Sequence, residues 1–186
     1  MRWRLLAAPC RVREFFIPAF IANWLVSIAL GVVYIIVTAV FLNVYWGNLI
    51  VLAAVLALIS MIATLSSVLI FIFTSKYSVA NAVSYIVAFG LMVLSGNMIP
   101  LTLFGDNAVV NFMLNHGTPL SIGQVAIISS GRLGGIFEGM AINIAMPGFS
   151  EIAGGMSRSA TNIITLLVIT VALGLVTWIA SRRRTI

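Results

Sequence analysis

The feature that most constrains this chain is the length of its uncharged apolar stretches. No Asp, Glu, Lys or Arg occurs between Phe15 and Ser75, and none occurs between Tyr77 and Gly105. A helix that crosses the hydrocarbon core of a bilayer needs about 20 predominantly apolar residues. The first stretch is therefore long enough for two crossings and the second for one. A further apolar run covers residues 161–180.

The composition argues against a soluble globular enzyme. The 186 residues are 62% hydrophobic and 8% charged, whereas about 25% of the residues of a soluble domain are charged. So few charged groups cannot solvate the surface of a globule, and so hydrophobic a chain does not stay disordered. The apolar runs are also continuous, unlike the short alternating segments of a membrane β-barrel. We therefore predict an all-α integral membrane helical bundle.

Short polar turns divide the chain into spans of a single transmembrane domain. Turns at Asn48 and Lys76 separate the first three apolar runs, and Pro100 lies where the third one ends. We expect four spanning helices, at residues 17–42, 49–73, 79–99 and 161–180. Residues 105–160 are rich in glycine yet still apolar, which favours short interfacial or re-entrant helices over a fifth full span. Residues 1–15 form a short basic segment.

The distribution of basic residues predicts the orientation. With four spans, both termini lie on the same side as the turn at Lys76, and this side carries every Lys and Arg except Arg132 and Arg158. Because basic residues collect on the cytoplasmic side, we expect a multi-pass cell-membrane protein with both termini cytoplasmic and residues 105–160 outside. The net charge of +6 then reflects topology and not nucleic-acid binding. A fifth crossing within residues 120–146 is the alternative, and it would move the C-terminus outside.

The sequence offers no catalytic, cofactor-binding or metal site. Residues 131–135 are glycine-rich but lack the Gly-Lys-Ser/Thr sequence that holds nucleotide phosphates. His116 is the only histidine and Cys10 the only cysteine, so the chain has no pair of metal ligands of either type. No carboxylate lies within a predicted span, which argues against a proton-driven carrier. We therefore expect this chain not to be an enzyme.

Small and weakly polar residues form stripes along the predicted spans. Residues at helical spacing share one face of a helix, and small residues let helices approach closely in lipid. The stripes comprise Asn23, Ser27, Tyr34 and Thr38 in the first span, and Ala53, Ala57, Ser60, Thr64 and Ser67 in the second. Two interpretations stay open: the stripes serve helix packing alone, or one of them also lines a path for an amphiphilic substrate.

Several motifs, taken in order, resemble a known family of membrane proteins. Residues 4–9 (RLLAAP) are followed by residues 13–15 (REF) and a long apolar span. Residues 74–76 (TSK) are followed by residues 80–82 (ANA), and residues 94–101 read LSGNMIPL. Over this part the chain is similar to the permeases of ABC-2 type transporters. The remainder fits the family by pattern, since re-entrant external helices and a last span with a basic cytoplasmic tail follow there.

The resemblance implies roles for individual residues. The segment that docks on an ATPase subunit would comprise Leu5, Leu6, Pro9, Arg13 and Glu14. The signature at the outer end of the penultimate span would comprise Ser95, Gly96 and Pro100. The implied partners are the ABC ATPase subunit, which hydrolyses ATP, and a second permease unit. Family permeases have six spans, so four spans imply the C-terminal part of a longer permease or two spans supplied by a separate chain.

Two other functions compete with ATP-driven export. A non-transporting assembly or immunity subunit would use the stripes to bind other transmembrane helices, and residues 5–14 would then lie on anionic lipid. A fragment of a secondary carrier would need an ionisable group at membrane depth, which the predicted spans lack. Membrane lipid is a partner in each case.

Overall fold

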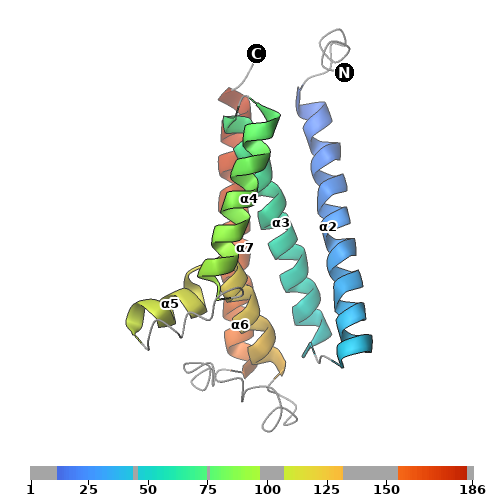
Figure 1. Cartoon of the computed structure of the whole chain (residues 1–186), viewed down its shortest axis with the longest axis vertical. Coiled ribbons are helices and arrows are strands. Elements are labelled where there is room, and N and C mark those ends of the chain that lie inside the picture. The colour runs from blue at the N-terminus through green and yellow to red at the C-terminus, as the bar shows by residue number, and fades with distance from the viewer. Residues whose placement is uncertain (1–11, 44–45, 75, 97–106, 132–154, 184–186) are drawn as a thin grey trace.

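The computed structural model describes residues 12–43, 46–74, 76–96, 107–131 and 155–183. All regular secondary structure in these ranges is helical (Figure 1). The helices are α2 (Val12–Leu42), α3 (Leu49–Phe73), α4 (Tyr77–Leu94), α5 (Ala108–His116), α6 (Pro119–Gly131) and α7 (Gly155–Arg183). Four of them are long and apolar enough to cross a membrane. The predicted all-α membrane bundle, with four spans and short helices before the last one, is confirmed.

The third span is shorter than the sequence analysis expected. The apolar parts of α2 and α3 cover Ile17–Leu42 and Leu49–Phe73, the same residues as the expected spans. Helix α4 instead ends at Leu94, not at residue 99. Gly96 has a φ of 77°, a left-handed conformation that glycine adopts readily and that closes a helix. Its backbone N–H donates to the carbonyl of Val93 at 3.0 Å.

The last helix begins earlier than expected. Helix α7 starts at Gly155, and its apolar part covers Ser159–Ser181, whereas the sequence analysis placed the span at residues 161–180. Residues 155–160, which were expected in the external segment, form the first turns of α7. The charge-free run marks where lipid would begin, and a helix can continue past that point because its backbone bonds are internal.

Successive long helices run in opposite directions. The start of α2, the turn between α3 and α4, and the end of α7 therefore lie at one end of the bundle, at the top of Figure 1. The α2–α3 turn lies at the opposite end, where Asn43 and Gly47 have φ values of 50° and 72°. There the side chain of Asn48 accepts a hydrogen bond from the backbone N–H of Ile50 at 2.9 Å and caps α3.

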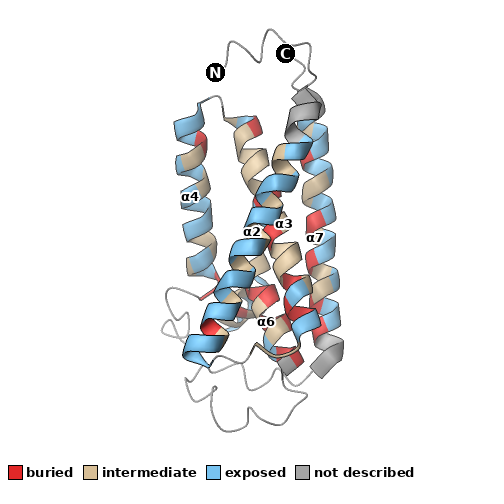
Figure 2. Ribbon diagram, turned by 90° about the vertical axis from the view of Figure 1, so that its right-hand side faces the viewer, coloured by how far each residue is buried: buried red, intermediate tan, exposed pale blue. Residues whose placement is uncertain are grey.

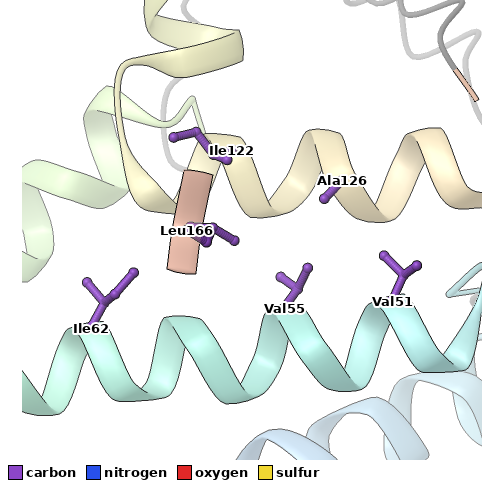
Figure 3. Close-up of a cluster of buried hydrophobic side chains, with 6 residues drawn as sticks. All are labelled: Val51, Val55, Ile62, Ile122, Ala126 and Leu166. Carbon is purple, nitrogen blue, oxygen red and sulfur yellow. The ribbon is translucent and has the colours of Figure 1, made fainter. Parts of the chain in front are cut away.

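Helix α3 is the centre of the bundle and contacts α2, α4, α6 and α7. On one side it shares an apolar cluster with α6 and α7 (Figure 3), made of Val51, Val55, Ile62, Ile122, Ala126 and Leu166. On another side Trp24 of α2 donates from Nε1 to the carbonyl of Ala57 at 3.1 Å. Most of α2 and α4 is exposed (Figure 2), and their exposed side chains are largely apolar. Hydrocarbon can solvate such a surface.

Helix α6 is a half-length helix inside the bundle. It runs antiparallel to α7, since Ser129 contacts Ser159 while Ile122 shares a cluster with Leu166. At 1.5 Å per residue, Leu166 lies about 10 Å beyond Ser159 along α7. The start of α6, one turn further, is thus about 15 Å from Ser159, roughly halfway along the apolar part of α7. Helices α5 and α6 contact each other, and α6 ends toward the end of the bundle that carries the α2–α3 turn (Figure 1).

Two glycines offer a test of the close packing between α6 and α3. A Cβ at Gly123 would lie 2.5 Å from Cδ1 of Ile59 and 3.0 Å from Cγ1 of Val55, whereas a Cβ at Gly174 would meet no atom within 4 Å. We expect Gly123→Val to lower the free energy of unfolding by about 1–3 kcal/mol, as overpacking does. Gly174→Val is the matched control and should leave it within about 0.5 kcal/mol. Unfolding in detergent, followed by circular dichroism, measures both. Equal stabilities of the two variants would contradict the packing described.

Candidate functional site

The structure covers only part of the expected ATPase-docking segment. Leu5, Leu6 and Pro9 lie outside the described residues. Arg13 and Glu14 lie in the first turn of α2, and their side chains lie outside the described part of the chain. Two of the five residues that the family resemblance marks for docking therefore belong to α2.

Two residues of the expected outer signature end helix α4. Ser95 is 3% exposed, its hydroxyl donates to the carbonyl of Met92 at 3.0 Å, and its backbone N–H donates to Leu91. Gly96 is also buried and has the left-handed backbone conformation given above. Pro100 lies outside the described residues. The described part of the signature therefore acts as a helix stop inside the bundle.

The polar stripe of α2 holds the α2–α3 turn at one end. Thr38 is buried and accepts a hydrogen bond from Nε1 of Trp46 at 3.0 Å, while its own hydroxyl donates to carbonyls of the preceding turn. The ring of Tyr34 meets Trp46 edge-on, with centroids 6.1 Å apart. These contacts fasten the chain after α2 back onto that helix.

The other members of this stripe do not all face the same way. Ser27 is half-buried and donates to the carbonyl of Asn23 at 2.9 Å, but Asn23 itself is exposed, as is Tyr34. The contact with α3 is made instead by Trp24 and by Gly31, which leaves room for Leu56. Trp24 was not predicted as a packing residue because the stripes were built from small and weakly polar side chains, and tryptophan is neither.

The stripe of α3 lies away from the apolar cluster. Ser60 and Thr64 are buried and Ser67 is half-buried, at helical positions roughly opposite Val55. The hydroxyl of Thr64 donates to the carbonyl of Ser60 at 2.7 Å, within the same helix. A hydroxyl bonded in this way costs little to bury against a neighbouring helix. This geometry suits helix packing, and a role in lining a path stays a prediction.

Helices α6 and α7 pack against each other, and buried polar side chains lie on both helices and at the start of α6. We call this set the α6–α7 seam: Thr118, Ser121, Ser129, Ser159 and Asn162. At one end of the seam the hydroxyl oxygens of Ser129 and Ser159 are 2.7 Å apart. Ser159 also reaches the carbonyl of Ala126 at 2.9 Å, and Ser129 reaches that of Val125 at 2.7 Å. Each hydroxyl has one proton, so two protons are available for the three contacts just given. Either serine can therefore be the donor in the contact between the two hydroxyls.

The other end of the seam is the buried start of α6. Thr118 and Ser121 are 2% and 0% exposed. The backbone N–H of Ser121 donates to Oγ1 of Thr118 at 3.0 Å, and the backbone N–H of Thr118 donates to Oγ of Ser121 at 3.0 Å. This is the reciprocal pattern of a capping box, and Pro119 suits the first helical position because it has no N–H to satisfy. The seam thus pairs the polar groups of a helix start that water does not reach.

Asn162 is the member of the seam with an unpaired donor. Its side chain is 3% exposed, and Nδ2 has no hydrogen-bond partner. It lies one turn along α7 from Ser159 and one turn before Leu166, on the helix face that packs against α6 and α3. The sequence analysis overlooked it, although an asparagine in the apolar run 161–180 is itself a signal.

The described residues contain no group of three or more His, Cys, Asp or Glu side chains that could hold a metal ion. The seam instead offers neutral hydroxyl and carboxamide groups. Comparison with protein-family models, with curated proteins and with solved structures finds no match to this chain. The likeness to ABC-2 permeases therefore rests on the motifs quoted from the sequence.

A double-mutant cycle tests the serine pair of the seam. We expect Ser129→Ala and Ser159→Ala each to destabilise the protein, and their coupling free energy to be about 0.6 kcal/mol and at most about 2, the range of interhelical hydrogen bonds in membranes. Thr165→Val is the control, since the Thr165 hydroxyl donates only to the carbonyl of Thr161 on its own helix. Unfolding of the purified variants in detergent gives the free energies. Strictly additive effects would show that the two hydroxyls do not interact.

Proposed function

We propose that the chain is the membrane-spanning permease component of an ABC-2 type exporter. ATP binding and hydrolysis belong to a separate ATPase subunit, and a second permease unit completes the transport path. The observation that carries the proposal is the order of the three motif regions, at residues 4–15, 74–82 and 94–101, along a chain with four membrane-length helices.

The architecture supports this proposal in its outer half. Helix α4 ends at Ser95 and Gly96, the short helices α5 and α6 follow, and α7 then returns to end in basic residues. This is the order that the resemblance implies for the penultimate span, the external helices and the last span.

The packing suggests how motion at the docking segment would reach the bundle. The last two residues of the segment, Arg13 and Glu14, belong to α2, which contacts the rest of the molecule mainly along α3. Trp24 and Gly31 provide that contact, and α3 in turn carries α6 and α7. A push on the start of α2 would therefore act on α3 first and on the seam last.

Co-purification tests the proposed ATPase partner. We expect a tagged chain, extracted from membranes in mild detergent, to retain a nucleotide-binding subunit. Glu14→Ala should reduce both this association and coupled ATPase activity at least several-fold, because it removes a charge from the docking segment, while membrane insertion stays intact. Asp106→Ala is the matched control: it removes a carboxylate that the proposal places on the other side, and it should have no effect.

Failure of this experiment points to the competing function. A chain that inserts normally but co-purifies with other membrane proteins and no ATPase would support a non-transporting assembly or immunity subunit. Full association of Glu14→Ala would remove the docking role from that residue.

Thiol labelling tests the proposed orientation. In a Cys10→Ser background, Leu49→Cys and Ser78→Cys place one exposed thiol at each end of the bundle. If both termini are cytoplasmic, a membrane-impermeant maleimide added to intact cells should label Leu49→Cys and not Ser78→Cys. Permeabilised cells should label both and provide the control. The reverse pattern would invert the proposed topology.

A further inference from the structure

The structure assigns a ligand position to the α6–α7 seam: we propose that Nδ2 of Asn162 donates a hydrogen bond to a small neutral oxygen acceptor that is not part of the protein chain. The acceptor is a water molecule or an oxygen of a membrane lipid. This inference is independent of the proposed export function, because it rests only on the packing of α6 and α7.

The unpaired carboxamide is the observation that carries the inference. Among the described side chains with buried nitrogen or oxygen atoms, Nδ2 of Asn162 stands out as lacking any partner. The other members of the seam show that this fold satisfies polar groups closely, since Thr118 and Ser121 exchange bonds and Ser129 pairs with Ser159. A buried donor without a partner is strongly unfavourable, and in hydrocarbon no bulk water compensates it.

The position of Asn162 suits a bridging molecule. Asn162 and Ser159 lie three residues apart on one face of α7, where Cβ atoms are about 5–6 Å apart. A molecule bonded to Asn162 therefore lies in the same part of the seam as the hydroxyl of Ser159, which contacts Ser129 across the helix pair. Buried waters typically make about three hydrogen bonds to such groups, and a hydroxyl oxygen accepts as well as donates.

The chemistry of the seam selects a neutral ligand. Its members are serine, threonine and asparagine, and its apolar neighbours include Leu166 and Ala126. No charged side chain is described in the seam, so an ion would lose its hydration without gaining a counter-charge. A carboxamide N–H offers its proton to an oxygen lone pair, which water, a hydroxyl or an ester carbonyl supplies.

Magnetisation transfer in solid-state NMR tests the proposal directly. The full chain is labelled with ¹⁵N-asparagine and reconstituted in phosphatidylcholine nanodiscs, and the Asn162 side-chain signal is assigned by its loss in Asn162→Leu. We expect transfer to these amide protons from water or from lipid protons. Perdeuterated lipid separates the sources: transfer that persists identifies water, and transfer that disappears identifies lipid. Transfer only from protein aliphatic protons would overturn the proposal.

Thermal stability provides the second measurement. Leucine has nearly the shape of asparagine, so Asn162→Leu removes the donor without opening a large cavity. If Nδ2 were bare, removing it would raise Tm by about 2–4 °C or more. With the site filled, we expect Tm to stay unchanged or to fall. Thr170→Val is the control, because the buried Thr170 hydroxyl is satisfied by the carbonyl of Leu166 at 2.7 Å. A higher Tm for Asn162→Leu alone would contradict the proposal.

Discussion

The start of α6 is the constraint on which the rest of the structure depends. In hydrocarbon, every backbone N–H and C=O must be paired within the protein, yet this helix begins about halfway along its neighbours. Thr118, Pro119 and Ser121 solve the problem locally, since proline removes one donor and the two hydroxyls pair with two others. Because these bonds lie within one turn of chain, the two backbone donors of Thr118 and Ser121 need no partner from α3 or α7. The depth of this helix start is therefore set largely by side-chain packing.

This packing produces a bundle of unequal parts. Helices α3, α6 and α7 share an apolar cluster, and α6 and α7 also share a polar seam, whereas α2 and α4 contact the molecule mainly along α3. In lipid, apolar area alone does not hold helices together, because lipid tails are as apolar as the side chains. The unit of α3, α6 and α7 is held by interdigitating side chains and hydrogen bonds. Helices α2 and α4 have fewer contacts of both kinds. The proposed export function would use this difference, since α2 packs loosely against a closely packed centre.

The sequence predicted what depends on single helices and missed what depends on pairs of helices. Charge-free runs placed the four spans because length and hydropathy are local properties, whereas some helix ends were misplaced. Helix α4 ends early, where the left-handed Gly96 closes the helix before the apolar run ends, and α7 begins earlier than its charge-free run. The stripe of α2 was drawn from periodicity, which groups residues by face but does not say which face meets α3. Asn162 is visible in the sequence, but its burial depends on where α6 lies. Residues 118–121 did carry a local signal, a threonine before proline with a serine three residues on, which the sequence analysis did not use.

The register of α6 against its neighbours follows from shape more than from polarity. The hydroxyls of Ser129 and Ser159 have several oxygens within reach, so small shifts would exchange one hydrogen bond for another at low cost. Gly123 behaves differently, because any sliding movement would bring a larger side chain of α6 against Val55 and Ile59. The contact at Gly123 therefore fixes the position of α6 along α3. The hydroxyls of Ser129 and Ser159 then form whichever hydrogen bonds that position allows. Asn162 is the group for which this fixed register leaves no partner in the chain, which is why the seam calls for a molecule from outside it.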